Sequence, residues 1–439
     1  MLQEKRVSRR RMLRQATGAG AAFAVGQFIP GRVFADQDRP GANQRVHVAI
    51  IGCGRRGGSY VYGGCMPNRV EVVATCDVRL GLAQTLANHV SCKAVCQDYR
   101  KILDRKDVEG VIVSTPDHWH ALPTIQACQA GKHVYIEKPM TLTIAEGRRM
   151  VEAARKYRRV VQCGSQQRST EPNRVGCKFL REGGLGKIER IVTYNFPSPW
   201  IVNLPSQPVP ADLDWDRWCG PAPLCPYHAS LFSPEGEPGW MSSNVFSSGE
   251  AGNWGGHAIG QVQWALGADD TGPVEVRVHG PALKPPVFDA PKPRQTAWGP
   301  ARLPAISFRY ASGVVLELST GPLSGAIFFG EKGKMEIGRG SVHSNPQDLI
   351  ANQRLADGPS YTTAHLNNWI DCWTAGSRPV EDVEAGHRTA TICHLVNIGR
   401  CLGRDLRWDP VTERFPGDDG ANRMLDRPRR KGYELPETV

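Results

Sequence analysis

The chain has 439 residues, and its 54 lysines and arginines exceed its 43 aspartates and glutamates to give a formal net charge of +11. A chain of this length can form two or three domains with a large buried core. Its composition, 40% hydrophobic and 22% charged residues, excludes a disordered or fibrous protein. The positive charge suggests a polyanionic partner, so its distribution along the chain is considered first.

The N-terminus has the pattern of an export signal. Arginines at positions 9–11 precede an apolar stretch rich in Gly and Ala over residues 16–29, and Ala35 is a small residue suited to cleavage. This arrangement resembles a twin-arginine signal, which carries proteins across a membrane already folded. We therefore expect residues 1–35 to be a signal peptide and the protein to be periplasmic or extracellular. No other apolar run approaches 18 residues, so no stable membrane insertion is expected once the signal is removed.

Over half of the excess positive charge belongs to this signal. Residues 1–35 hold seven basic residues and one acidic residue, and without them the formal net charge falls from +11 to +5. A second basic cluster, residues 427–431, is expected to be a solvated chain end rather than a surface for nucleic acid. We therefore expect no nucleic-acid partner.

The thirteen cysteines show no metal-binding pattern, because no pair of CxxC motifs occurs. No metal site is predicted. A protein that folds before export does so in a reducing compartment, so we expect mostly free thiols.

The first half of the mature chain begins with a nucleotide-binding pattern. A short apolar strand over 46–51 runs into Gly52, Gly54 and Gly57, which form a G-x-G-x-x-G. Such glycines allow a tight turn and let the backbone approach a pyrophosphate at the N-terminus of the next helix.

The second predicted strand, 70–76, ends at Asp77. A carboxylate at this place can accept hydrogen bonds from both adenosine ribose hydroxyls, and it repels a 2′-phosphate. This favours NAD over NADP, although Arg55, Arg56 or Arg79 could offset the repulsion.

Predicted strands then alternate with predicted helices as far as Cys163. The strands cover 110–114, 133–136 and 160–163, and the helices end near 130 and 157. This alternation predicts a doubly wound parallel sheet, hence an α/β Rossmann domain over residues 45–165, with ligands at the carboxyl ends of the strands. Besides Asp77, the candidate cofactor-binding residues at or near those ends are Thr115, Pro116, Asp117, His120, Glu137, Lys138 and Gln166.

The second half predicts an α+β domain over residues 166–415, followed by a tail, 416–439. After a helix near 171–182, strands and hairpin-like turns indicate a large, mostly antiparallel open sheet. Helices are predicted after Asn253 and near the end. The strands are expected at 188–196, 274–278, 305–310, 314–319, 326–329 and 335–337, and the last two helices at 365–374 and 382–402.

A long region of low periodicity, 197–250, interrupts this domain. Its tryptophans could stack on a sugar or could anchor the packing of the loops. They are Trp200, Trp215, Trp218 and Trp240.

These motifs resemble the Gfo/Idh/MocA oxidoreductases. The resemblance rests on the Gly52–Gly57 turn, on Thr115-Pro116 with His120, and above all on Glu137-Lys138-Pro139 after the sequence AGKHV. It implies an NAD(P)-dependent enzyme that interconverts CH–OH and C=O on a sugar or sugar derivative. It also implies a homodimer or homotetramer formed through the open sheet.

Lys138, His257 and Asn253 are the candidate catalytic residues. A lysine at a strand end beside the nicotinamide would be partly desolvated, which suits it to exchange a proton with the reacting oxygen. The resemblance implies that His257 is an acid/base, but Asn253 stands where the family has Asp, and Gly260 where a second acid is often found. An amide can hold a hydroxyl group but cannot take its proton. Either Lys138 and His257 suffice for the acid/base steps, or other residues carry out this chemistry.

Export constrains the reaction further. Free NAD is scarce outside the cytoplasm, so a protein exported after folding is expected to carry its cofactor tightly bound and to regenerate it in place. One alternative is therefore an NAD-dependent glycosidase or lyase that oxidises the sugar transiently and eliminates the aglycone, although such family members tend to lack the lysine at position 138. A non-catalytic sugar-binding protein is the other alternative, favoured by Asn253 and Gly260 and disfavoured by Lys138.

Overall fold

The structure is a computed structural model that describes residues 41, 44–233, 239–291, 303–350, 353–354 and 361–439. The predicted export signal lies outside these residues. The chain divides into two compact units, residues 1–46 with 68–71 and residues 47–67 with 72–439. In the described part of the smaller unit, Arg45 Nη1 lies 3.4 Å from Glu71 Oε2. The larger unit contains every residue of the site described below.

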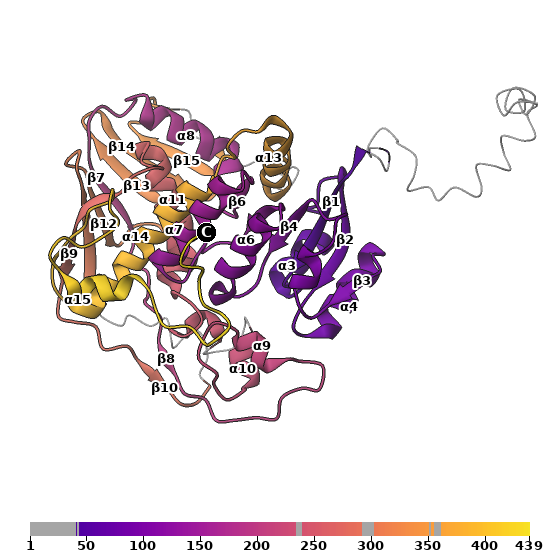
Figure 1. Cartoon of the computed structure of the whole chain (residues 1–439). Coiled ribbons are helices and arrows are strands. Elements are labelled where there is room, and N and C mark those ends of the chain that lie inside the picture. The colour runs from indigo at the N-terminus through magenta and orange to yellow at the C-terminus, as the bar shows by residue number, and fades with distance from the viewer. Residues whose placement is uncertain (1–40, 42–43, 234–238, 292–302, 351–352, 355–360) are drawn as a thin grey trace, which may run out of the picture. The chain divides into compact units, whose positions relative to one another are not determined.

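The predicted parallel sheet is present and has six strands (Figure 1). Their order is β3-β2-β1-β4-β5-β6, the arrangement of doubly wound dinucleotide-binding folds. Apolar residues such as those at 48–50 are fully buried because helices cover a parallel sheet on both faces. The strands are β1 Val46–Ile51, β2 Val70–Cys76, β3 Ala94–Cys96, β4 Gly110–Val113, β5 His133–Ile136 and β6 Val161–Cys163.

The helices of this half follow the strands. A capping box stabilises the start of α7, since Thr143 Oγ1 accepts from Glu146 N at 3.2 Å and Glu146 Oε2 accepts from Thr143 N at 3.2 Å. The helices are α3 Arg55–Tyr62, α4 Leu80–Val90, α5 Arg100–Leu103, α6 Ala121–Gln129 and α7 Ile144–Lys156.

The second sheet has nine strands in the order β16-β15-β14-β13-β7-β12-β11-β9-β17. Among the adjacent strands of this sheet in the described residues, β7 and β12 run parallel and the other pairs run antiparallel. The prediction of a mostly antiparallel sheet is therefore confirmed. The predicted hairpins join β11 to β12 and β13 to β14. The strands are β7 Ile188–Tyr194, β9 Pro273–His279, β11 Ala305–Tyr310, β12 Val315–Ser319, β13 Ala326–Gly330, β14 Gly333–Gly338, β15 Ser341–Asn345, β16 Gln353–Arg354 and β17 Leu406–Arg407.

Helices pack on the nine-stranded sheet and connect it to the parallel sheet. In Figure 1, α14 lies between α7 and α11, and it contacts both helices as well as β9. This layer places the start of α11 beside the carboxyl ends of the parallel strands. The helices are α8 Glu171–Arg181, α11 Glu250–Leu266, α13 Tyr361–Ala375, α14 Val383–Leu402 and α15 Asp419–Asn422.

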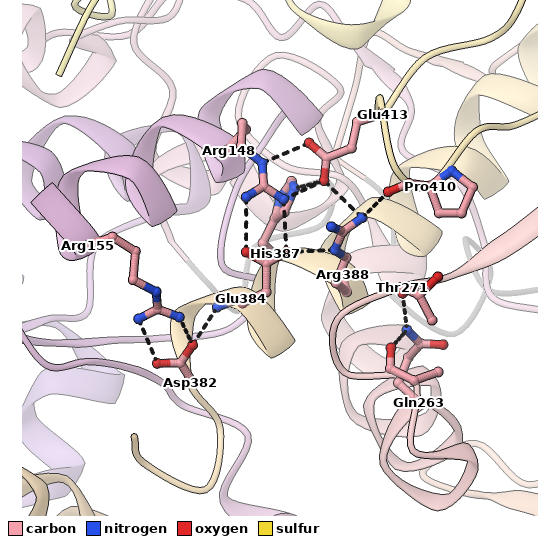
Figure 2. Close-up of polar contacts among 11 residues, drawn as sticks. Arg148, Arg155, Gln263, Thr271, Asp382, Glu384, His387, Arg388, Pro410 and Glu413 are labelled. Atoms are coloured by element: carbon pink, nitrogen blue, oxygen red, sulfur yellow. Dashed lines mark hydrogen bonds and ion pairs between the residues drawn. The ribbon is translucent and has the colours of Figure 1, made fainter. Parts of the chain in front are cut away.

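An ion-pair network holds α7 against α14 (Figure 2). Arg148 Nη2 lies 2.9 Å from Glu384 Oε1 and 2.6 Å from Glu413 Oε1. His387 Nε2 also lies 2.7 Å from Glu413 Oε1, and Arg388 Nη1 lies 3.1 Å away. Because three basic groups surround Glu413, their contacts outweigh the effect of burial, and the pKa of this carboxyl group lies far below its usual value.

Residues 204–233 and 239–246 form a separate apolar cluster, here called the aromatic segment. The rings of Trp215 and Trp218 stack with centroids 4.4 Å apart, and α9 Trp215–Cys219 and α10 Ala229–Phe232 lie within the segment. Trp200, Trp215 and Trp218 are buried, which suits a role in loop packing, and Trp218 also reaches the cavity described below.

The basic cluster at 427–431 is bound to the rest of the protein, so the prediction of a solvated chain end is wrong. Arg427 Nη1 donates to Val245 O at 2.8 Å, Arg429 Nη2 lies 3.1 Å from Glu146 Oε1, and Arg430 Nη1 lies 2.7 Å from Asp216 Oδ1. The guanidinium groups find carbonyl and carboxylate acceptors far away in the sequence, which a local charge pattern does not reveal.

All thirteen cysteines, each within the described residues, are free thiols. The described ranges contain no group of three or more His, Cys, Asp or Glu side chains placed to hold a metal ion. Among the helices that the structure describes, none has the length and apolar character needed to cross a bilayer.

Candidate active site

A cavity of about 1230 Å³ opens at the carboxyl ends of the parallel strands. It exceeds the roughly 300–1,000 Å³ of a typical small-ligand pocket, so it has room for an extended ligand and a second small molecule. Most predicted site residues line it, namely Gly52, Gly54, Arg55, Arg56, Asp77, Thr115, Pro116, Asp117, Glu137, Lys138, Gln166, Asn253 and His257.

The glycine turn shapes one end of the cavity. Gly52 has a φ of +90°, and a Cβ there would lie 2.8 Å from the backbone of Ser114 and Thr115. A Cβ on Gly54, the residue before α3, would meet open space. Gly57 is not among the lining residues, because it lies behind the turn, where a Cβ would come within 2.0 Å of Gly52 O. Its missing side chain lets α3 pack against the turn.

Asp77 lies beside the glycine turn. Its Oδ2 accepts from Cys53 N at 2.7 Å and its Oδ1 accepts from Arg79 N at 2.8 Å. Burial raises the pKa of Asp77 to about 6. Arg79 directs its side chain elsewhere, since its Nε lies 3.0 Å from Asp212 Oδ2 and its guanidinium lies over the ring of Phe232.

Glu137 is the centre of a polar group in the wall of the cavity. Its Oε1 accepts from Arg56 Nε at 2.8 Å, from Gln166 Nε2 at 3.0 Å and from the Tyr60 hydroxyl. Burial opposes ionisation, but Arg56, Tyr60 and Lys138 outweigh it and lower the pKa of Glu137. The buried carboxylate therefore stays charged and fixes the start of the loop that carries Lys138.

His120 ties together two loops of the cavity wall. It is buried, with Nδ1 2.7 Å from Pro139 O and Nε2 2.8 Å from Thr115 O. His120 is not among the residues that line the cavity, so the structure places it behind the predicted cofactor site. Thr115 Oγ1 is buried and has no hydrogen-bond partner within the described chain, which leaves this hydroxyl available to a ligand.

Asp117 lies in the same wall and is also buried. Its Oδ2 accepts from Ser247 Oγ at 2.8 Å. Burial raises the pKa of Asp117 despite the opposing effects of His120 and Ser247.

Lys138 faces the start of α11. Its Nζ donates to Asn253 Oδ1 and lies 3.5 Å from Asn253 O. Burial lowers the pKa of Lys138, while the negative charges of Glu137 and Glu250 partly oppose this effect. The structure thus joins two predicted catalytic residues that are 115 positions apart.

His257 lies one helical turn after Asn253. It is 4% exposed, and its Nδ1 has no hydrogen-bond partner among the described residues. Burial, with the positive charges of Lys138 and Arg339, holds the pKa of His257 well below its usual value. The ring is therefore neutral near pH 7 and can orient a ligand hydroxyl.

Several residues of the cavity were not predicted. Arg339 lines it and donates from Nη2 to the Tyr361 hydroxyl at 2.9 Å, while its guanidinium lies over Trp254. Gly260, where a second acid was considered, does not line it; its carbonyl accepts from Arg168 Nη2 at 3.1 Å. Long-range packing brings these residues into place, and no local motif marks them. The aromatic segment adds Trp218, Tyr227, Phe232 and Trp240 to the cavity wall.

Comparison with solved structures shows the same fold. The aldose–aldose oxidoreductase of Caulobacter crescentus, complexed with glycerol, is 19% identical, with a TM-score of 0.59 over 83% of this chain and 99% of that chain. A levoglucosan dehydrogenase complexed with NADH and levoglucosan is 18% identical, with the same coverage and TM-score. The WlbA dehydrogenase of Bordetella pertussis, complexed with NADH and UDP-GlcNAcA, is 16% identical, with a TM-score of 0.58 over 83% of this chain and 99% of that chain.

Curated relatives match a shorter part of the chain. A glycosyl hydrolase family 109 protein of Shewanella sp. strain W3-18-1 is 35% identical over 118 residues. The match covers 25% of this chain and 26% of that protein, so the two share about a quarter of their lengths. This likeness alone does not assign the relative's activity to this chain.

Two family models together account for most of the chain. The NAD-binding Rossmann-fold model of the oxidoreductase family GFO_IDH_MocA matches residues 46–165. The C-terminal alpha/beta domain model of the same family matches residues 185–435. The chain therefore belongs to the Gfo/Idh/MocA family of NAD-binding oxidoreductases.

Proposed function

We propose that this protein is an exported sugar oxidoreductase that interconverts CH–OH and C=O and keeps its NAD bound. The observation that carries the proposal is a single cavity that is lined both by the glycine turn with Asp77 and by Lys138, Asn253 and His257. The first set suits a dinucleotide, and the second suits a small polyol.

The residues of the cavity fit the cofactor. Open space at Gly54 and the unpartnered Thr115 hydroxyl leave room and a polar group for it. Asp77 would hold the adenosine ribose hydroxyls, and α3 would face the pyrophosphate with its N-terminus. Arg79 is engaged by Asp212, and Arg56 by Glu137, so neither of these two side chains is directed at a 2′-phosphate. When bound, NAD supplies hydride acceptance and donation.

Lys138 would act as the general base and general acid for the reacting hydroxyl group. Burial lowers the pKa of its amine, so a larger fraction of the amine is uncharged and able to accept a proton near neutral pH. The uncharged Nζ would accept the proton of the substrate hydroxyl during oxidation and would return it in the reverse reaction. His257, neutral and with a free Nδ1 within the described chain, would hold the same hydroxyl in place.

The aromatic segment supports the retention of the cofactor. Residues 79 and 213 form an antiparallel bridge, and Asp214 N donates to Val78 O at 3.0 Å. These bonds hold Tyr227 and Phe232 in the wall of the cavity that also contains Asp77. A cofactor bound between Asp77 and this wall would leave only when the aromatic segment moves away. This suits a protein that binds its cofactor before export. The signal-like sequence over 1–35 is the basis for the proposed location outside the cytoplasm.

A second candidate function is NAD-dependent glycoside cleavage. The glycosyl hydrolase family 109 relatives, matched over about a quarter of this chain, favour it, whereas the lysine at position 138 favours the dehydrogenase. Absorbance of the purified protein during addition of a sugar and aryl-glycoside panel separates the two. A nicotinamide band that changes without release of an aglycone supports the oxidoreductase, and aglycone release without a net change supports the glycosidase. Sugar binding with neither signal would identify the non-catalytic binding protein and overturn both.

The oligomeric state is also a proposal. The nine-stranded sheet carries paired charges on exposed side chains, including Arg190 with Glu317 and Arg309 with Glu275. Such a broad sheet surface suits self-association into a homodimer or homotetramer. Light scattering that gives a single-chain mass would overturn this part of the proposal.

A further inference from the structure

Asn253 connects Lys138 to an acidic residue that does not line the cavity. Asn253 Oδ1 accepts from Lys138 Nζ, and Asn253 Nδ2 donates to Glu250 Oε2 at 3.1 Å. An ammonium group only donates and a carboxylate only accepts, so these two partners fix the orientation of the amide. Hydrogen bonds therefore link the three side chains in series, from Lys138 at the cavity through Asn253 to Glu250.

Glu250 is well placed to hold a negative charge. It is the first residue of α11, where the helix dipole favours a carboxylate. It lies three residues before Asn253, so the two side chains share one face of the helix. Glu250 is absent from the residues that line the cavity, so it would reach the reacting atoms only through Asn253 and Lys138.

We propose that Glu250 is the positioning residue that replaces the aspartate expected at position 253. The negative charge has moved one helical turn back, and the amide of Asn253 transmits its effect to the Lys138 amine. This inference rests on the proposed function for its catalytic consequence, but the arrangement itself does not.

Several elements packed around Lys138 carry charged groups that affect its pKa. Arg56 on α3 disfavours the ammonium form, whereas Glu137 beside Lys138, Asp117 after β4 and Glu250 on α11 favour it. His257 on the same helix is neutral. Arg56 and Glu137 form an ion pair with each other at 2.8 Å, and Asp117 accepts a hydrogen bond from Ser247 Oγ at 2.8 Å, so these acids have other partners. Glu250 is therefore the acid whose removal should change the titration of Lys138 most selectively.

The test measures the titration of Lys138 without a sugar substrate. The full-length protein is labelled with acetic anhydride across a pH series, and mass spectrometry gives the labelling midpoint of the Lys138 peptide. Glu250→Gln should lower that midpoint by about one pH unit, because an attractive negative charge is lost. Glu189→Gln, on the exposed part of β7, is the matched control and should leave the midpoint unchanged.

A charge-swapped variant gives the second reading. Glu250→Gln combined with Asn253→Asp restores one negative charge next to Lys138, so the midpoint should return to at least the value of the unmodified protein. An unchanged midpoint in the single variant, or one below the unmodified value in the double variant, overturns the proposal. If the single variant does not fold, the double variant decides alone by the same criterion.

Kinetics then tests the link to catalysis. The dependence of kcat on pH is measured with a sugar that changes the nicotinamide band. Glu250→Gln should move the acidic limb of this pH profile to lower pH by the same number of pH units as the labelling midpoint, and it should leave KM unchanged. A kcat profile that stays fixed while the labelling midpoint moves contradicts the role of Lys138 in the proposed function and leaves the effect of Glu250 on Lys138 intact.

Discussion

Arg79 Nε lies 3.0 Å from Asp212 Oδ2 although the two residues are 133 positions apart. Arg79 lies two residues after Asp77, just beyond the end of β2, and Asp212 belongs to the aromatic segment. The ion pair is partly exposed, with side chains 37% and 43% accessible, and is therefore weak by itself. Leu80 N donates to Asp212 O at 3.1 Å, so backbone bonds strengthen the connection over the cavity.

Asp212→Ala should accelerate loss of the cofactor. An exposed ion pair contributes up to about 1 kcal/mol, which corresponds to roughly a fivefold faster release of NAD. Nicotinamide absorbance after repeated gel filtration measures the retained fraction. Glu317→Ala breaks a comparable exposed pair on the nine-stranded sheet and should have no effect. Equal retention in both variants would show that the segment does not hold the cofactor.

Asp77 should make NAD binding dependent on pH. Its carboxyl group has a pKa of about 6, and only the ionised form accepts hydrogen bonds with both oxygens. As the pH falls below about 6, the Kd for NAD should rise about tenfold per pH unit. Asp77→Asn should bind NAD more weakly and lose this dependence. Calorimetric titration from pH 5 to pH 8 checks both results, and a persisting dependence in the variant would assign it to another group.

Lys138→Ala should abolish turnover while NAD stays bound. General acid–base groups contribute about 10²–10⁴-fold to the rate, and the glycine turn and Asp77 remain in place. Stopped-flow absorbance gives the rate, and the spectrum of the purified variant gives the bound cofactor. Lys334→Ala, at an exposed position of β14, serves as the control. Undiminished turnover in Lys138→Ala would refute its catalytic assignment.

Glu413 should stabilise the junction of α7 and α14 in a pH-dependent way. Its folded pKa lies below the ordinary 4.5, so its contribution is complete above that value and is lost as the pH falls below it. Breaking such a buried pair costs about 3–5 kcal/mol, so Glu413→Gln should lower the free energy of unfolding near pH 7 by an amount of this order. Urea unfolding should show the difference from the unmodified protein shrinking below pH 4.5. A constant difference would point to packing instead of charge.

The parallel sheet could be predicted because its strands are short apolar runs that end in glycine or a polar residue. The same pattern placed Asp77, Thr115 and Lys138 at one edge, and the cavity brings them together. The edge strands β16 and β17 and the neighbouring β15 were not predicted, since their sequences show little alternation of apolar and polar residues. Arg339 and Glu250 were missed for another reason. Their places depend on contacts between elements far apart in sequence, and neither belongs to a recognisable motif.

The contacts of Arg430 and Tyr433 have a consequence for how the cavity forms. Arg430 donates from Nε to Gly220 O at 2.7 Å, and the ring of Tyr433 packs on Trp119, a residue of the cavity wall. Both contacts join segments that are far apart in the sequence, and Arg430 and Gly220 are separated by 210 positions. The nucleotide-binding half therefore cannot complete this wall by folding alone, and its ability to hold a ligand depends on the folding of the second half.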